Sequence, residues 1–93
     1  MEISYDGVKR ALTLEKRGLD FSDAARLFAG PEYTVADDRT EYGEERFQTY
    51  GLIGDRLVIV VWTARGEARH IISMRKCNER ERKKYEGQLD RSG

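Results

Sequence analysis

The chain has few of the residues that identify a class of protein directly. Cys77 is the one cysteine, so an intrachain disulfide is excluded and a reducing compartment, the cytoplasm, is expected. With one cysteine and one histidine, a structural zinc site is close to excluded. No apolar run approaches the roughly 20 residues of a membrane span, and no segment is flanked like a signal peptide. We therefore expect neither a membrane nor a metal to take part.

The formal net charge is also zero, although the charges are unevenly distributed along the chain. Residues 1–45 hold 6 Lys/Arg and 11 Asp/Glu, a balance of −5, whereas residues 46–93 hold 11 and 6, a balance of +5. This polarity is typical of a protein that meets a polyanion with one surface, although solvated helix faces would give the same pattern. A length of 93 residues predicts one domain with one core.

Capping residues place two helices in the first third of the chain. Asp6 can accept hydrogen bonds from the free N–H groups of a helix over residues 7–17, which would end at Gly18. Asp20 is expected to start a second helix, which the sequence Gly30-Pro31 would stop. Residues 2–5 are expected to form a short edge strand.

The rest of the chain reads as a meander followed by a helix. Strands are predicted over residues 33–36, 45–52, 57–63 and 69–76, with a polar, acidic loop over residues 37–43. Asn78 is expected to cap a final helix over residues 79–89, and residues 90–93 to form a frayed tail. The fold class is therefore α+β, with N-terminal helices packed on an antiparallel β-sheet and a C-terminal helix.

The basic strand over residues 69–76 gives the first indication of function. The preceding strand is apolar on both faces, as a central strand should be. Strict alternation in the basic strand places Arg69 and Arg75 on one face and His70 on the other. Two arginines on one face of a strand close to the core indicate an anionic ligand, and phosphate is the anion we expect.

Several motifs of the chain resemble the BrnT toxin family. They are Gly43–Phe47 (GEERF), Thr63–Gly66 (TARG), Arg69–Lys76 (RHIISMRK), and Lys16–Phe21 with Asp23–Ala25 in the predicted helix pair. The resemblance spans about residues 3–87. Tyr5 stands where the family usually has Trp, and Arg17 where it often has His, so no catalytic histidine is carried over to that position.

The resemblance implies a single RelE-like toxin domain over residues 1–93. It implies a ribonuclease that cleaves RNA (mRNA, free or on the ribosome) and halts translation and growth, with no cofactor. It also implies neutralisation by a BrnA-type antitoxin with a ribbon-helix-helix region. The complex would repress its own promoter, so operator DNA would be bound only through the antitoxin.

Metal-independent RNA cleavage needs a base, an acid and cations that stabilise the pentacoordinate phosphate. Arg65, Arg69 and Arg75 are the predicted cations, because a guanidinium group pairs bidentately with phosphate oxygens. This hypothesis requires the three side chains to converge on one cleft. Side chains splayed to opposite faces, or held in carboxylate pairs, would contradict it.

The acid and base are less clearly indicated. Glu45 is a candidate base, and Lys9 and Tyr85 are candidate proton donors or phosphate contacts. His70 has a suitable intrinsic pKa, but alternation points it away from Arg69, which favours a half-buried or surface histidine.

Four further basic residues are candidates for binding RNA. They are Arg46, Lys76, Arg80 and Lys83. Glu45 and Arg46 could equally form ion pairs on a solvated face, and Trp62 is expected in the core rather than stacked on a base. The alternative function is a non-catalytic module that binds nucleic acid or protein. A DNA-binding regulator is disfavoured, because no helix-turn-helix or basic N-terminal arm is evident.

Overall fold

The computed structural model describes residues 2–37 and 43–92, with side chains up to Gln88. Its elements are β1 (Ile3–Tyr5), α1 (Gly7–Arg17), the 3-10 turn η1 (Phe21–Asp23), α2 (Ala24–Ala29), β2 (Glu32–Asp37), β3 (Arg46–Ile53), β4 (Arg56–Arg65), β5 (Ala68–Lys76) and α3 (Glu79–Ser92). This order confirms the predicted α+β class. Most of the predicted loop over residues 37–43 lies outside the described residues.

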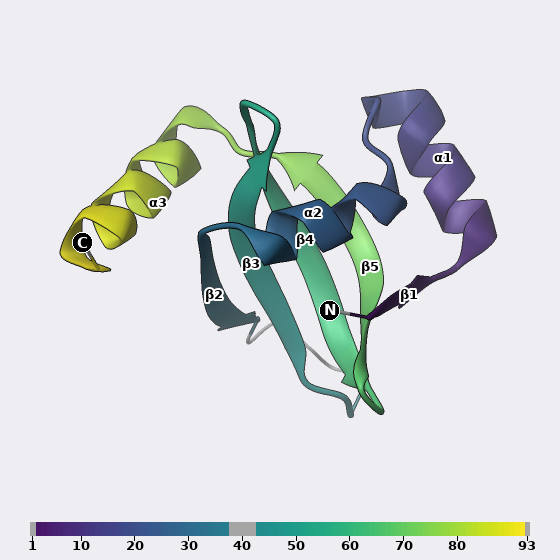
Figure 1. Cartoon of the computed structure of the whole chain (residues 1–93). Helices are drawn as coiled ribbons and strands as arrows, with labels where there is room; N and C mark the ends of the chain where they lie inside the picture. The colour runs from purple at the N-terminus through teal and green to yellow at the C-terminus, as the bar shows by residue number, and fades with distance from the viewer. Residues whose placement is uncertain (1, 38–42, 93) are drawn as a thin grey trace.

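The strands form one sheet in the order β1-β5-β4-β3-β2. The short edge strand β1 runs parallel to β5, and the other neighbours are antiparallel. In Figure 1, α2 crosses one face of the sheet, α1 lies beyond β1, and α3 lies toward the β2 edge. We call the two sides of the sheet the α2 face and the α3 face, after the helix that packs on each.

The core is divided between these faces because β4 is apolar on both. On the α2 face, Val58 and Val60 are fully buried and pack with Leu27 of α2 and Ile71 of β5. The larger cluster on this side is completed by Leu19, Phe21, Ala24, Phe28, Trp62 and Met74. Removing so much apolar surface from water is the main source of stability in a domain of this size.

A smaller apolar cluster lies on the α3 face. Ile59 and Leu57 of β4 pack there against Tyr50 of β3, and Tyr85 brings α3 onto them. The rings of Tyr50 and Tyr85 stack with centroids 6.4 Å apart. These contacts join the last helix to the sheet.

The predicted caps explain where α1 begins and ends. Asp6 Oδ1 accepts hydrogen bonds from the N–H groups of Val8 and Lys9, at 2.8 and 3.2 Å. Gly18 ends the helix with φ at +68°, a conformation that favours glycine. None of the side chains of α1 is buried, and its apolar residues Val8 and Leu12 are 70% and 47% exposed.

The second helix differs from the prediction. Asp20 accepts a hydrogen bond from the N–H of Ser22 at 3.0 Å, but it caps the 3-10 turn η1 rather than an α-helix. The α-helix α2 begins only at Ala24. At the other end of the chain, the predicted cap of α3 at Asn78 is confirmed, and it is reciprocal, because Asn78 and Glu81 exchange hydrogen bonds of 2.9 Å each.

Candidate nucleic-acid interface

An irregularity in β5 changes which side chains share a face. Its register with β4 shifts between Val61 and Trp62, which leaves Ile72 as an extra residue without a partner on β4. A bulge of this kind reverses the alternation of the side chains beyond it. Arg69 therefore lies on the α2 face and Arg75 on the α3 face. The prediction that the two arginines share a face is wrong.

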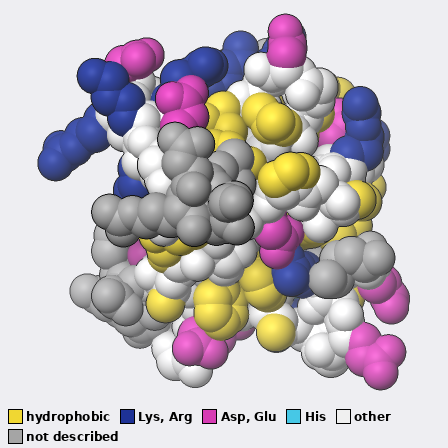
Figure 2. Space-filling model, turned by 60° about the vertical axis from the view of Figure 1, so that its left-hand side comes forward, with side chains coloured by type: hydrophobic (Ala, Val, Ile, Leu, Met, Phe, Trp, Pro, Cys, Tyr) yellow, Lys and Arg dark blue, Asp and Glu magenta, His cyan; other side chains and the backbone are white. Residues whose placement is uncertain are grey.

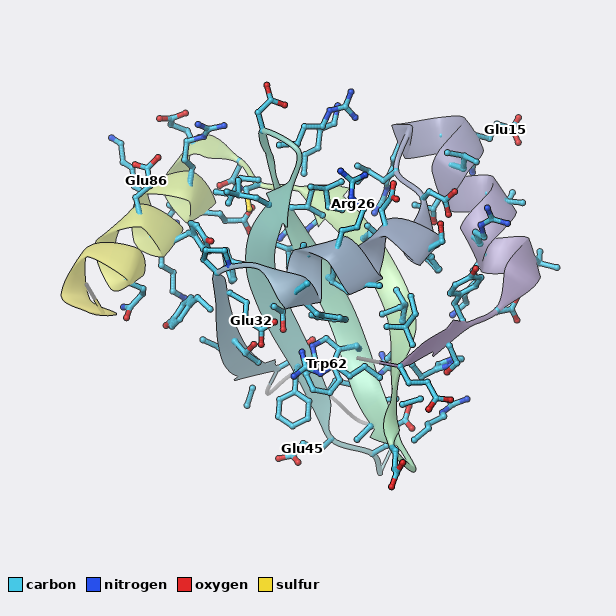
Figure 3. The ribbon with its side chains drawn as sticks, in the orientation of Figure 1. Glu15, Arg26, Glu32, Glu45, Trp62 and Glu86 are labelled. Carbon is cyan, nitrogen blue, oxygen red and sulfur yellow. The ribbon has the colours of Figure 1, made fainter. Side chains whose placement is uncertain are left out.

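Arg69 packs into the aromatic part of the α2 face. Its guanidinium carbon lies 4.3 Å from the ring centroid of Trp62 and 4.5 Å from that of Phe28. One guanidinium nitrogen lies 3.5 Å from Glu32 Oε1, and Figure 3 shows Glu32 and Trp62 on the same side of the sheet. Such contacts are those of a cation that covers an aromatic cluster. They favour a structural role for Arg69.

Trp62 is a core residue, as predicted. It is 8% exposed, and its Nε1–H donates to Thr49 Oγ1 at 2.8 Å. The ring also stacks on Phe47, with centroids 4.7 Å apart. With both its edge and its face occupied, the indole is not available as a platform for a base.

Arg75 is paired with α3. Its two terminal nitrogens donate to the two carboxylate oxygens of Glu81, the first at 2.7 Å. These hydrogen bonds raise the pKa of Arg75 and lower that of Glu81. The same carboxylate caps the helix, so Arg75 links the end of β5 to the start of α3. Two of the three predicted catalytic arginines are therefore held in carboxylate pairs on opposite faces, which contradicts the single three-arginine cleft.

A different set of polar side chains lines up across the α3 face. Residues that pair directly across the strands share a face. The pairs Asp37–Arg46, Arg46–Thr63, Thr63–His70 and His70–Ser4 follow one another through all five strands. We call Asp37, Arg46, Thr63, His70 and Ser4 the polar row.

Two further cations flank the polar row. Arg65 lies two residues beyond Thr63 on β4, on the same face, diagonally opposite both Arg46 and His70. Diagonal neighbours of this kind are roughly 7–8 Å apart, within reach of a long side chain. Lys9, in the first turn of α1, is close enough for its charge to lower the pKa of His70. Arg65, Arg46 and Lys9 are thus the predicted site residues that the fold gathers in one region.

His70 lies within this group of charges. Its Nδ1 is 2.8 Å from Ser4 Oγ, which fixes the orientation of the imidazole ring. Partial burial lowers the pKa of His70 from its ordinary value, and the charge of Arg65 lowers it further. Unbroken alternation along β5 predicts His70 on the face opposite both Arg69 and Arg75, which hides its place among these charges. The available signal was compositional, since His70 is the one histidine of the chain.

The other predicted acid–base residues lie elsewhere. Tyr85 is 2% exposed and its hydroxyl donates to the carbonyl of Pro31 at 3.0 Å, which favours a structural role. Glu45 is exposed, and its backbone carbonyl accepts a hydrogen bond of 2.7 Å from Thr63 Oγ1. Figure 3 shows the Glu45 side chain at the lower end of the sheet, pointing outward. Arg46 forms an ion pair of 3.7 Å with Glu44.

The remaining basic candidates lie at the opposite end of the sheet from the polar row. Lys76 lines a surface hollow of about 460 Å³ together with Arg56 and Arg82. Arg80 and Lys83 are exposed on α3. Since Arg56 begins β4 and the polar row crosses it at Thr63, seven residues later, roughly 23 Å of strand separates the two regions. Figure 2 shows Lys and Arg side chains interspersed with Asp and Glu on that side of the molecule.

Within residues 2–37 and 43–92, no three His, Cys, Asp or Glu side chains come together as a metal site would require. None of the helices in the described part of the chain is both long and apolar enough to span a membrane.

A small α+β domain whose sheet carries a polar row flanked by cations is suited to binding a polyanion. Comparison with known families defines the class further. The family of ribonuclease toxins named BrnT, of type II toxin–antitoxin systems, matches residues 5–81. The chain belongs to this family, whose members are ribonuclease toxins. No curated protein matches the chain. The family match contains the polar row from Asp37 to His70 and ends before Lys83 and Tyr85.

Proposed function

We propose that this toxin is a metal-independent endoribonuclease that binds RNA at the polar row and cleaves it by attack of a 2′-hydroxyl on the adjacent phosphate. Cleavage of mRNA in the cytoplasm would arrest translation and growth. The observation that carries the proposal is the gathering of Arg46 and Arg65 on one sheet face, with Lys9 close enough to His70 for its charge to act there, within a ribonuclease toxin family.

The chemistry requires positive charge where the pentacoordinate phosphate develops its own negative charge. Arg65 is exposed and can reach a substrate without leaving a buried site. Arg46 is half-buried and forms an ion pair with Glu44 at 3.7 Å among its contacts, so a phosphate would have to replace contacts that it already makes. Removing one contact to a transition state of this kind costs about 2.7–4 kcal/mol, or 100- to 1000-fold in rate.

Cleavage of a short RNA in the presence of EDTA tests the proposal. We expect products that end in a 2′,3′-cyclic phosphate and a 5′-hydroxyl. A single 2′-deoxy nucleotide at the cleaved position should abolish cleavage, because it removes the nucleophile. RNA that stays intact while still bound would instead identify a non-catalytic binding module.

Arg65→Ala is the matching variant, and we expect its cleavage rate to fall 100- to 1000-fold. Arg26→Ala is the control, because Arg26 lies on α2 with its side chain 66% exposed, on the other side of the sheet. Equal activity in the two variants would show that the polar row is not the site.

A type II toxin implies a cognate antitoxin. We propose that this antitoxin is of the BrnA type, with a ribbon-helix-helix region through which the complex binds and represses its operator. A gel shift with operator DNA tests this: the toxin alone should not bind, and the complex should bind more tightly than the antitoxin alone.

A further inference from the structure

We propose that His70 is the general base of RNA cleavage at the polar row, oriented by Ser4 and flanked by Arg65 and Lys9. This inference rests on the proposed ribonuclease function and assigns the acid–base residue of that site. It replaces Glu45, whose side chain points outward at the lower end of the sheet.

The position of His70 follows from the bulge in β5. Because Ile72 has no partner on β4, the side chain of His70 lies on the α3 face, as does that of Thr63, its partner on β4. A phosphate bound by Arg46 on β3 and Arg65 on β4 would therefore lie next to β5, the strand that carries the imidazole. Arg69, one residue earlier, points to the opposite face.

The hydrogen bond to Ser4 determines which nitrogen can act. A base at Nε2 requires the proton to be on Nδ1, from which it is donated to Ser4 Oγ across the observed 2.8 Å. The Nε2 lone pair then points away from β1. Ser4 is thus a positioning residue, because it holds the plane of the ring without touching the substrate.

The charges around the imidazole suit a base. Burial and the charges of Arg65 from β4 and Lys9 from α1 disfavour protonation of the ring. The carboxylates of Glu44 and Asp6 favour it, and the pKa of His70 is lowered on balance. A lowered pKa favours the neutral ring, which is the form that can accept a proton. A bound phosphate offsets the two cations, which raises the proton affinity of the ring once substrate is in place.

The step balances with the residues present. The 2′-hydroxyl proton passes to His70 Nε2 while the bond between the 2′-oxygen and phosphorus forms. The bond between phosphorus and the 5′-oxygen breaks, and the Lys9 ammonium gives that oxygen a proton. The products are a 2′,3′-cyclic phosphate and a 5′-hydroxyl, after which His70 loses a proton to water and Lys9 regains one.

The single histidine permits a direct measurement in the intact toxin. The NMR signal of His70 Cε1–H, followed against pH, should give a pKa below 6.5 in the free protein. A single-stranded DNA oligonucleotide has the phosphates of RNA but no 2′-hydroxyl, and saturation with it should raise that pKa. An unchanged pKa in the DNA complex would overturn the inference.

Kinetics give the second readout. His70→Gln keeps a polar side chain for Ser4 and should lower kcat/KM for RNA by roughly 10²–10⁴-fold. Its affinity for the DNA oligonucleotide should stay within about twofold of wild type. The wild-type kcat/KM should fall as pH falls through the pKa of His70, because protonation removes the base. The residual activity of His70→Gln should lack this acid limb.

Two further variants separate a catalytic role from a structural one. His70→Ala should regain part of its activity in added imidazole, which a merely unstable variant would not do. Ser4→Ala should lose less activity than His70→Gln. If the wild-type protein cleaves RNA and His70→Gln is equally active, this inference alone is overturned. If the wild-type protein cleaves no RNA, the proposed function is overturned as well.

Discussion

Asp20 joins α1 to the turn that follows it. Its carboxylate accepts hydrogen bonds from Arg10 Nε at 2.8 Å and Nη2 at 3.0 Å, and also from the N–H of Ser22. The Arg10 hydrogen bonds contribute most to holding the pKa of Asp20 well below its usual range. A carboxylate with a depressed pKa in the folded state stabilises the fold only while it is ionised.

Asp20→Asn should therefore produce a pH-dependent change. Asparagine can still cap η1 but cannot pair with Arg10. We expect the variant to be less stable than wild type at pH 7. The difference should shrink as pH falls below about 4, where the unfolded carboxylate becomes protonated. Urea denaturation at several pH values measures it. Asp23→Asn is the control, because its pair with Arg26 is exposed and 3.8 Å long.

At the scale of elements, α2 packs on β3 through a glycine. A Cβ atom at Gly51 would lie 2.7 Å from Leu27 Cγ and 2.9 Å from its Cδ2. Leu27 is fully buried, so it cannot move aside without disturbing the core. The absence of a side chain at Gly51 therefore determines how closely the helix approaches the sheet.

Gly51→Ala should lower the free energy of unfolding by about 1–3 kcal/mol, as overpacking does. In a Leu27→Ala background the additional cost should disappear, because the space is then free. Gly7→Ala is the matched control, since no atom would lie within 4 Å of its Cβ. Chemical denaturation of the four variants and wild type tests the coupling, and strictly additive losses would contradict it.

The pair of Arg75 and Glu81 connects β5 to α3. We expect Arg75→Ala and Glu81→Gln to lower stability by similar amounts, and the double variant to lose little more than either one, because both remove the same interaction. Glutamine at 81 keeps the helix cap. Ribonuclease activity should stay within about tenfold of wild type in both, and it is measured below the unfolding transition.

A 100- to 1000-fold loss of ribonuclease activity in Arg75→Ala, but not in Glu81→Gln, would contradict this prediction. It would mean that the arginine leaves Glu81 to contact phosphate, as the sequence predicts.

At the scale of the whole molecule, the opposite charges of the two halves of the chain cancel to a formal net charge of zero. RNA binding must therefore depend on local clusters rather than on overall attraction. If Arg46, Arg65 and Lys9 each contact a phosphate, the logarithm of the association constant for a single-stranded oligonucleotide should fall linearly with the logarithm of the salt concentration. The expected slope is roughly −2. Arg65→Ala should reduce the slope by roughly 0.7. Fluorescence anisotropy with a labelled oligonucleotide measures both, and a salt-independent affinity would contradict phosphate binding.

Local rules were sufficient for much of this fold. The caps at Asp6 and Asn78 and the stop at Gly18 depend on hydrogen bonds and backbone angles within a few residues, so they could be read from the chain. The central position of β4 could also be predicted, because a strand that is covered on both faces must be apolar on both. The family motifs could be recognised because each is a continuous stretch of the sequence.

The site could not be read in this way. Which face an arginine of β5 occupies depends on the extra residue Ile72, and that bulge exists only relative to the register of β4. A period of two does not show where the alternation is interrupted, so the sequence alone predicts Arg69 and Arg75 on one face. The polar row is likewise a property of pairing, because Ser4 and His70 are 66 residues apart in the chain and meet only when β1 adds to the sheet. The residue types and their local conformations came from the sequence alone. Their grouping into a site was decided by strand pairing, because interactions between distant segments set the register.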